Sequence, residues 1–226
     1  MPMPRRVIAW IAASLLLVSG CAAAQAQGQP RSTDPAGVFD HYLLALTWMP
    51  SFCAMTGDGR GDARCTAGQR LGWQVHGLWP QHADGSWPEY CRSPHRNPSR
   101  QETGRQAGLF GASGAAWHQW NKHGTCTGLS PADYYALTRL AWEGLVLPEI
   151  FDAVTRDLVV APAVIGAAVI EANPGLTDDM LLVTCRRDAV YELRLCLTRE
   201  LQPRPCAPQT RLRACALDAA RLPALR

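Results

Sequence analysis

The chain has 226 residues, of which 47% are hydrophobic and 18% are charged. This composition suits one ordinary folded domain and excludes a chain that is disordered throughout. The formal net charge of +3 is too small to indicate a highly basic coat for nucleic acid. Binding of a polyanion would therefore depend on basic groups that cluster locally.

The first 26 residues are predicted to be a secretory signal peptide. Arg5 and Arg6 precede an apolar run at 7–18 that is too short to span a bilayer comfortably, and residues 24–26 (Ala-Gln-Ala) are typical of a cleavage site. A second interpretation stays open. Residues 18–21 (Val-Ser-Gly-Cys) resemble a bacterial lipoprotein signal, which would end at residue 20 and leave a lipid anchor on Cys21.

Residues 27–38 are rich in Ala, Gln, Gly and Pro and are expected to be a flexible linker, followed by one domain at 39–226. No transmembrane segment is expected after processing. The protein is predicted to be exported, either to the periplasm or outside the cell, or to the outer membrane if Cys21 carries a lipid.

Hydrophobic patterns along residues 39–226 predict an α+β domain. Apolar runs at 41–48 and 71–79 are typical of strands, and two further strands are expected at 180–185 and 190–197, joined by a turn at 186–188. Ser130 and Pro131 are suitable residues for the start of a helix, and two more helices are predicted at 148–157 and 162–172. Residues 51–70 and 81–114 are expected to be loops. Strands at both ends with helices between them are typical of this fold class.

Two segments concentrate chemically unusual residues. The first, Trp-Gln-Val-His-Gly-Leu-Trp-Pro, covers residues 73–80, and the second, Trp-His-Gln-Trp-Asn-Lys-His-Gly-Thr-Cys, covers residues 117–126. Together they contain three of the six histidines, which are His76, His118 and His123. Imidazoles exchange protons near neutral pH, so these residues are candidates for general acid–base catalysis.

Cleavage of RNA needs groups that accept and donate protons. The ribose 2′-hydroxyl attacks the neighbouring phosphate, so an enzyme supplies one group that takes the 2′-proton and another that protonates the leaving 5′-oxygen. A cation is also needed beside the phosphate as charge develops. His76 and His123 are candidates for the acid–base pair, Lys122 and His118 for holding the phosphate, and tryptophan faces for stacking on bases.

Simpler interpretations apply to the other candidates. His118 and His123 are five residues apart, which differs from the i, i+4 spacing of helical zinc ligands, so neither a metal nor a cofactor is expected. Trp73 and Trp120 are expected in the core. His41, His82 and His95 are assigned surface or structural roles.

The cysteines are typical of an exported protein. Eight of the nine follow Cys21, and an even set of this kind predicts a framework of four disulfides. The sequence alone allows about 105 pairings.

The two segments closely resemble the active-site segments of the ribonuclease T2 family: His-Gly-Leu-Trp-Pro, then His-x-Trp-x-Lys-His-Gly-Thr-Cys some forty residues later. The similarity extends from about Phe39 to Cys215. It implies a central antiparallel β-sheet with flanking α-helices in a disulfide-bonded single domain. It also implies cleavage of single-stranded RNA through a 2′,3′-cyclic phosphate to 3′-phosphates with low base specificity, without a metal.

The resemblance further assigns roles to residues. His76 would be the general acid, His123 the general base, His118 a phosphate ligand and Lys122 the cation that stabilises the crowded phosphorane. Trp79 and an aromatic residue placed like Trp87 would hold a base between them. The disulfides would be Cys53–Cys65, Cys91–Cys126, Cys185–Cys215 and Cys196–Cys206.

One departure from the family pattern bears on the rate. The family usually has Glu directly after the phosphate-binding histidine, whereas this chain has Gln119, which carries neither charge nor proton. We expect a slower or retuned enzyme. Two alternatives remain open: a catalytically weakened RNA-binding or toxin-like module on the same scaffold, and a disulfide-bonded structural protein of the cell envelope. The partner is expected to be single-stranded RNA and not DNA, and the protein is expected to be a monomer.

Overall fold

The computed structural model describes Met1 and residues 35–226. The predicted signal peptide, Cys21 and most of the predicted linker lie outside the described residues. The described end of that linker contacts the domain. Pro35 forms an isolated bridge with Arg92, and the N–H of Gly37 donates to the carbonyl of Cys126 at 2.9 Å.

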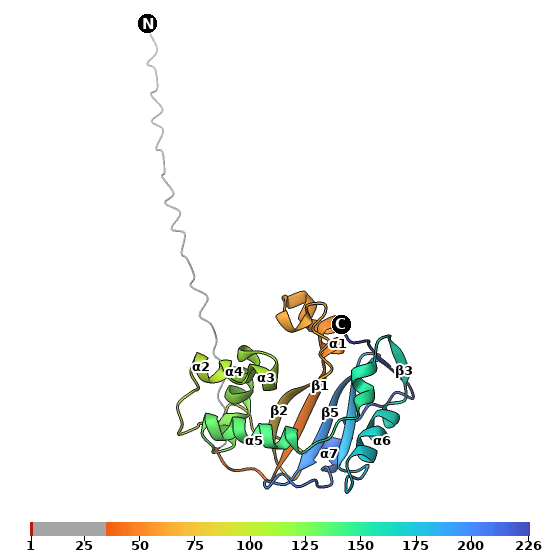
Figure 1. Ribbon diagram of the computed structural model, residues 1–226. Helices are drawn as coiled ribbons and strands as arrows, with labels where there is room; N and C mark the ends of the chain where they lie inside the picture. Colours follow the sequence, from red (N-terminus) through yellow and green to blue (C-terminus); the bar gives the residue numbers. More distant parts are fainter. Residues whose placement is uncertain (2–34) are drawn as a thin grey trace.

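A mixed but mainly antiparallel sheet lies at the centre of the domain (Figure 1). Its strands are β1 (His41–Trp48), β2 (Trp73–Gln81), β3 (Leu158–Val160), β4 (Leu181–Arg186), β5 (Ala189–Leu197) and β6 (Ala220–Leu222). Within residues 35–226 the order of the six strands is β2-β1-β5-β6-β3, with β4 also paired to β5. The pairings are antiparallel except between β5 and β6, which run parallel.

Helices cover both ends of this sheet. In the described chain they are α1 (Met49–Phe52), α2 (Arg100–Gly104), α3 (Ala107–Phe110), α4 (Ser113–Lys122), α5 (Pro131–Glu143), α6 (Pro162–Ala172) and α7 (Pro208–Arg211). Helices α2 to α5 gather beside β2, whereas α6 lies at the other end of the sheet near β3 (Figure 1). Single helical turns occupy Cys53–Gly57, Asp58–Arg60, Ala63–Cys65, Gly124–Cys126 and Glu149–Ala153.

Most predicted elements are confirmed. The strands at 41–48, 71–79, 180–185 and 190–197 correspond to β1, β2, β4 and β5, and the helix at 162–172 corresponds to α6. The helix expected after Ser130 is α5, where the Ser130 hydroxyl accepts from the backbone N–H of Asp133 at 3.2 Å.

The helix predicted at 148–157 is wrong. A short 3₁₀ turn covers Glu149–Ala153, and the chain then forms β3. Phe151 packs edge-on against the rings of Trp48 and Trp73, and β3 pairs with β6, about sixty residues later. Both contacts are non-local, and tertiary contacts of this kind override local propensity.

The two segments predicted as loops contain more structure than expected. Residues 51–70 hold the second half of α1 and three helical turns, and residues 81–114 hold α2 and α3. The start of α2 is a capping box, in which the side chains of Ser99 and Glu102 each accept a hydrogen bond from the backbone N–H of the other residue. Helix α4, which carries the second catalytic segment, was not among the predicted elements.

Strand β1 lies between the main core and the opposite face of the sheet, which carries Trp79 and is called the functional face below. Its side chains alternate between the two faces of the sheet, as strand geometry requires. Leu44, Leu46 and Trp48 belong to the main core, whereas Leu43 packs with Trp79 on the opposite face. The strand is buried throughout because both of its faces are covered.

Strand β2 contains a β-bulge at His76. Gly77 pairs with Ala45 and Val75 pairs with Leu46, so His76 is the extra residue on its strand. The bulge explains why Val75 and Leu78, three positions apart, both enter the main core. Bulges of this kind reorient side chains and occur often beside active sites.

Four disulfides join the eight cysteines that follow Cys21. The pairs are the ones that the family resemblance implies: Cys53–Cys65, Cys91–Cys126, Cys185–Cys215 and Cys196–Cys206. All four S–S bonds lie within residues 35–226, and two of them join β4 and β5, at Cys185 and Cys196, to the segment that follows β5.

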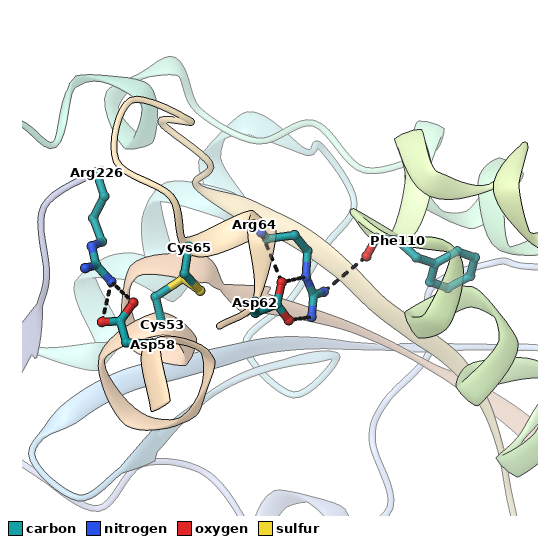
Figure 2. Close-up of a disulfide and its surroundings, with 7 residues drawn as sticks. All are labelled: Cys53, Asp58, Asp62, Arg64, Cys65, Phe110 and Arg226. Atoms are coloured by element: carbon teal, nitrogen blue, oxygen red, sulfur yellow. Dashed lines mark hydrogen bonds and ion pairs between the residues drawn. A yellow bond between two sulfur atoms is a disulfide. The ribbon is translucent and has the colours of Figure 1, made fainter. Parts of the chain in front are cut away.

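The Cys53–Cys65 loop is also anchored by ion pairs (Figure 2). Arg64 pairs with Asp62 at 2.7 Å and donates to the carbonyl of Phe110 at 3.3 Å. Asp58 pairs with Arg226 at 2.8 Å. The loop is therefore attached to α3 on one side and to the C-terminal segment on the other.

Candidate active site

The two predicted catalytic segments meet at one cavity. Strand β2 contributes His76 and Trp79, the end of α4 contributes His118 and Lys122, and His123 follows directly as the C-cap of that helix. All five side chains line a cavity of about 200 Å³. The structure thus brings together the imidazoles that the sequence placed on separate segments.

Helix α4 sets the spacing of its functional residues. His118 and Lys122 are one turn apart and therefore lie on the same helix face. The N–H of His123 donates to the carbonyl of Gln119 at 3.0 Å, which holds His123 at the helix end. A Cβ on the next residue, Gly124, would lie 2.6 Å from the ring of Trp120, so glycine permits this close packing.

His123 is suited to accept a proton. It is 4% exposed, and its ring stacks on Trp79 with centroids 5.1 Å apart. Burial, together with the charges of Lys122, His76 and His118, holds the pKa of His123 well below its usual range. The ring is therefore neutral at neutral pH, which is the form that a general base needs.

His76 lies in a contrasting environment. Its side chain is 39% exposed, and its Nδ1 lies 2.6 Å from Oε1 of Glu192. Glu192 is itself 3% exposed and also pairs with Arg194, at 2.6 Å. Burial raises the pKa of the Glu192 carboxyl, but the hydrogen bond and charge of His76, with those of Arg194, outweigh it and lower the pKa to about 2.

This contact fixes the roles of the two ring nitrogens. Glu192 is ionised at neutral pH and accepts hydrogen bonds without donating any, so Nδ1 of His76 is the donor. Nε2 is then the nitrogen available to a ligand in the cavity. His76 and His123 therefore differ in their surroundings: one contacts a carboxylate and is partly exposed, and the other is buried against an indole.

His118 and Lys122 supply the cationic side of the cavity. His118 is half-buried, and burial, Lys122 and His76 together lower its pKa. Nζ of Lys122 lies 2.9 Å from Oε1 of Glu89, a residue of the segment after β2. A phosphate bound here would meet an ammonium and an imidazole on adjacent turns of one helix.

Gln119 holds the indole of Trp79. Its Oε1 accepts from Nε1 of Trp79 at 2.8 Å, and the side chain is buried. A Cβ at Gly77 would collide with both of these side chains, so the glycine of the motif leaves room for their contact. Gln119 thus has a definite structural task on the wall of the cavity.

Trp87 lies at the mouth of the same cavity. It is 38% exposed, its Nε1 donates to Oε1 of Glu89 at 2.7 Å, and the guanidinium of Arg213 lies 4.1 Å from its ring centroid. Trp79 and Trp87 line the cavity together with Gln81. The structure therefore provides two indoles in the wall of the cavity that the imidazoles also line.

A second, larger cavity lies on the other side of His76 and His118. It has a volume of about 470 Å³ and is lined by Thr47 and Gln74 from the sheet. The ion-paired Asp62 and Arg64 form another part of its wall (Figure 2). His76 and His118 therefore lie between two cavities, so a chain-like ligand has room on both sides of them.

Sequence reasoning missed several residues of this site. Glu192 and Arg194 occupy alternate positions of β5, opposite in direction to Leu193 and Leu195, which enter the core. Two charged residues on one face of an otherwise apolar strand are a signal that was available in the sequence. Glu89 and Arg213 lie in irregular segments, where no periodicity marks them.

The remaining candidates have structural positions. Trp120 is fully buried and Trp73 packs against the main core, as expected. His41 is fully buried, whereas His95 is exposed and its Nε2 lies 3.2 Å from the carbonyl of Gly128.

Across residues 35–226, no three His, Cys, Asp or Glu side chains are grouped closely enough to hold a metal ion. In the same part of the chain, no helix has the length and apolar character needed to cross a membrane.

Solved structures resemble this fold over most of the chain. An RNase-related protein from Calystegia sepium has a TM-score of 0.65 at 20% identity and covers 83% of this chain and 98% of its own. RNase NT, solved in complex with 5′-AMP, has a TM-score of 0.61 at 20% identity, with coverages of 83% and 99%. At this identity the similarity establishes the fold alone.

Sequence relatives are also ribonucleases by name. The ribonuclease of Aeromonas hydrophila is 38% identical over 115 residues, which are 51% of this chain and 47% of that protein. Ribonuclease DdI of Dictyostelium discoideum is 32% identical over 143 residues, 58% of this chain and 60% of its own length. The chain thus spans about half the length of the curated relatives that it matches.

A family model matches the larger part of the described domain. The model is that of the Ribonuclease T2 family, and it matches residues 39–206, which include both segments of the site and most of the sheet. The chain belongs to the ribonuclease T2 family.

Proposed function

We propose that the chain is an endoribonuclease that cleaves single-stranded RNA by transphosphorylation, without a metal ion and with low base specificity. One observation carries this proposal: a buried imidazole that is neutral and an imidazole that contacts a buried carboxylate line the same cavity, beside a lysine. Family membership and the ribonuclease names of the relatives support it.

The first step uses these residues as an acid–base pair. His123 takes the proton of the 2′-hydroxyl while the 2′-oxygen attacks phosphorus. The bond from phosphorus to the 5′-oxygen breaks, and His76 gives its proton to that oxygen, which leaves a 2′,3′-cyclic phosphate. Lys122 and His118 stabilise the negative charge that develops on the phosphate oxygens.

The second step reverses these roles. His76 has lost its proton and accepts one from a water molecule, which attacks the cyclic phosphate. His123 returns its proton to the 2′-oxygen, and the product ends in a 3′-phosphate. Trp79 and Trp87 would stack on a base without reading its hydrogen-bonding edge, which supports low specificity. DNA lacks the nucleophile and is not a substrate.

The proposed setting of this activity is outside the cytoplasm, with the mature protein acting as a monomer. The four disulfides support export, because such bonds persist in oxidising compartments. Cleavage of the leader after residue 26 and a lipid on Cys21 remain alternative proposals. Mass spectrometry of the mature N-terminus decides between them.

The test is an assay of mature protein on polyuridylate and polyadenylate in EDTA. We expect cyclic-phosphate and then 3′-phosphate ends, and a bell-shaped dependence of rate on pH. His76→Ala and His123→Ala should each reduce kcat/KM by about 10²–10⁴. His95→Ala, at an exposed histidine, is the matched control and should retain activity. Products with 5′-phosphates, or a requirement for added metal, would contradict the mechanism.

A further inference from the structure

Strand geometry places a charged pair on the functional face of the sheet. Glu192 and Arg194 alternate along β5 with Leu193 and Leu195, which enter the main core. Glu192 is paired in register with Thr47 of β1, the strand that separates β5 from β2. Glu192 is thus positioned to contact the side chain of His76, which extends over β1 from the bulge in β2.

Each oxygen of the buried carboxylate has its own partner. Oε1 faces Nδ1 of His76 at 2.6 Å, whereas Oε2 accepts from Nε and Nη2 of Arg194 at 2.9 and 2.6 Å. Removing an ionised carboxylate from water is costly, and these contacts compensate for that cost. Because Arg194 occupies one oxygen with two donors, the other oxygen is held in a fixed direction toward His76.

Other charged groups also lie around His76. Lys122 of α4 pairs with Glu89, and both line the smaller cavity with His76. From β5, Arg194 also lies 5.5 Å from the ring centroid of Trp79. Asp62 and Arg64, which line the larger cavity with His76, pair with each other. Glu89 and Asp62 thus have cationic partners of their own, and Glu192 is the carboxylate that contacts His76.

We propose that Glu192, oriented by Arg194, is the positioning residue that fixes the ring of His76 and directs its Nε2 to the leaving 5′-oxygen. This inference rests on the proposed function, in which His76 is the general acid. Since the carboxylate accepts from Nδ1 in both charge states, it also holds neutral His76 in the tautomer whose Nε2 is free to accept a proton. The same contact therefore serves both steps of the reaction.

The decisive experiment compares two substrates in Glu192→Gln. With a dinucleoside phosphate, whose alkoxide leaving group needs a proton, kcat should fall by about 10- to 100-fold, a part of what a general acid contributes. KM should change little, because Glu192 does not contact the substrate. With a uridine 3′-(4-nitrophenyl) phosphate, whose phenolate leaves without protonation, kcat should change less than threefold.

Rescue by a shorter carboxylate is the second readout. Glu192→Asp should restore part of the rate on the dinucleoside phosphate. Glu171→Gln removes the same charge from an exposed position of α6 and is the matched control, with both substrates unaffected. Equal loss of kcat on the two substrates, or no rescue by Glu192→Asp, would overturn the proposal.

A measurement on the wild-type protein covers the case in which Glu192→Gln does not fold. Nitrogen-15 NMR should show Nδ1 of His76 protonated on both sides of its titration, and a neutral ring with the proton on Nε2 would overturn the proposal. The same spectrum separates this inference from the proposed function. If the wild-type protein fails to cleave RNA but shows the protonated Nδ1, the proposed function fails and the contact stands.

Discussion

Replacing Gly77 with alanine tests whether the wall of the site is as closely packed as the structure indicates. The new Cβ would collide with Oε1 of Gln119 and Nε1 of Trp79, which are joined by a hydrogen bond of 2.8 Å. Overpacking of this kind costs about 1–3 kcal/mol, and loss of the hydrogen bond adds about 1 kcal/mol. Trp79 must also move from its stacked position on His123.

The expected result is a loss of both stability and rate. A shift of the indole moves the imidazole that stacks on it, and a misplacement of about 1 Å costs about 10²-fold in rate. Urea unfolding monitored by far-UV circular dichroism measures the stability, and cleavage of polyuridylate measures the rate. Gly166→Ala is the control, since its Cβ would meet no atom closer than 3.7 Å within a helix. A Gly77→Ala protein with unchanged stability and kcat would refute the reasoning.

Three further predictions concern single groups. Burial, assisted by the charge of Arg204, lowers the pKa of His41 to about 4 from an ordinary 6.5. Between these two pH values the unfolded state binds more protons than the folded state, so the free energy of unfolding decreases as the pH falls through this range. His41→Phe should reduce that loss in urea titrations at pH 7 and 4.5, and an unchanged difference would contradict it. Gln119→Glu should raise kcat, because it restores the charge that the family usually has at this position; an equal or lower kcat would mean that the site is adapted to the amide. Replacing Cys91 and Cys126 by serine opens a loop of 35 residues and should cost about 4 kcal/mol in calorimetry. A loss below about 1 kcal/mol would mean that other contacts, such as that from Tyr90 to Lys122, hold the segment.

The histidines of the candidate site were predictable because their signal is local. Each lies in a short segment whose residue types are unusual together, and the family resemblance joins the two segments. The strands and α6 were predictable for a similar reason, because hydrophobic periodicity reflects which face of an element is buried. Ser130 marked the start of α5 through side-chain chemistry that acts over three residues.

The rest depends on contacts between distant parts of the chain. β3 forms because it pairs with β6, and no pattern within residues 158–160 indicates that partner. Glu192 reaches His76 across an intervening strand, at a sequence separation of 116 residues. Periodicity assigns Glu192 to one face of the sheet. It does not give the register of the neighbouring strands, which decides the residue that lies beside Glu192 on that face.

Because of the bulge in β2, the number of residues in this strand decides which of its side chains face the core. Val75 before it and Leu78 after it face inward only because one additional residue separates them. Deleting that residue would keep the strand paired but would exchange the inward and outward sets on one side of the deletion. The interior would then receive polar groups while the cavity lost the imidazole of His76. We therefore expect related sequences to vary here by substitution, and insertions or deletions to be confined to the loops on either side.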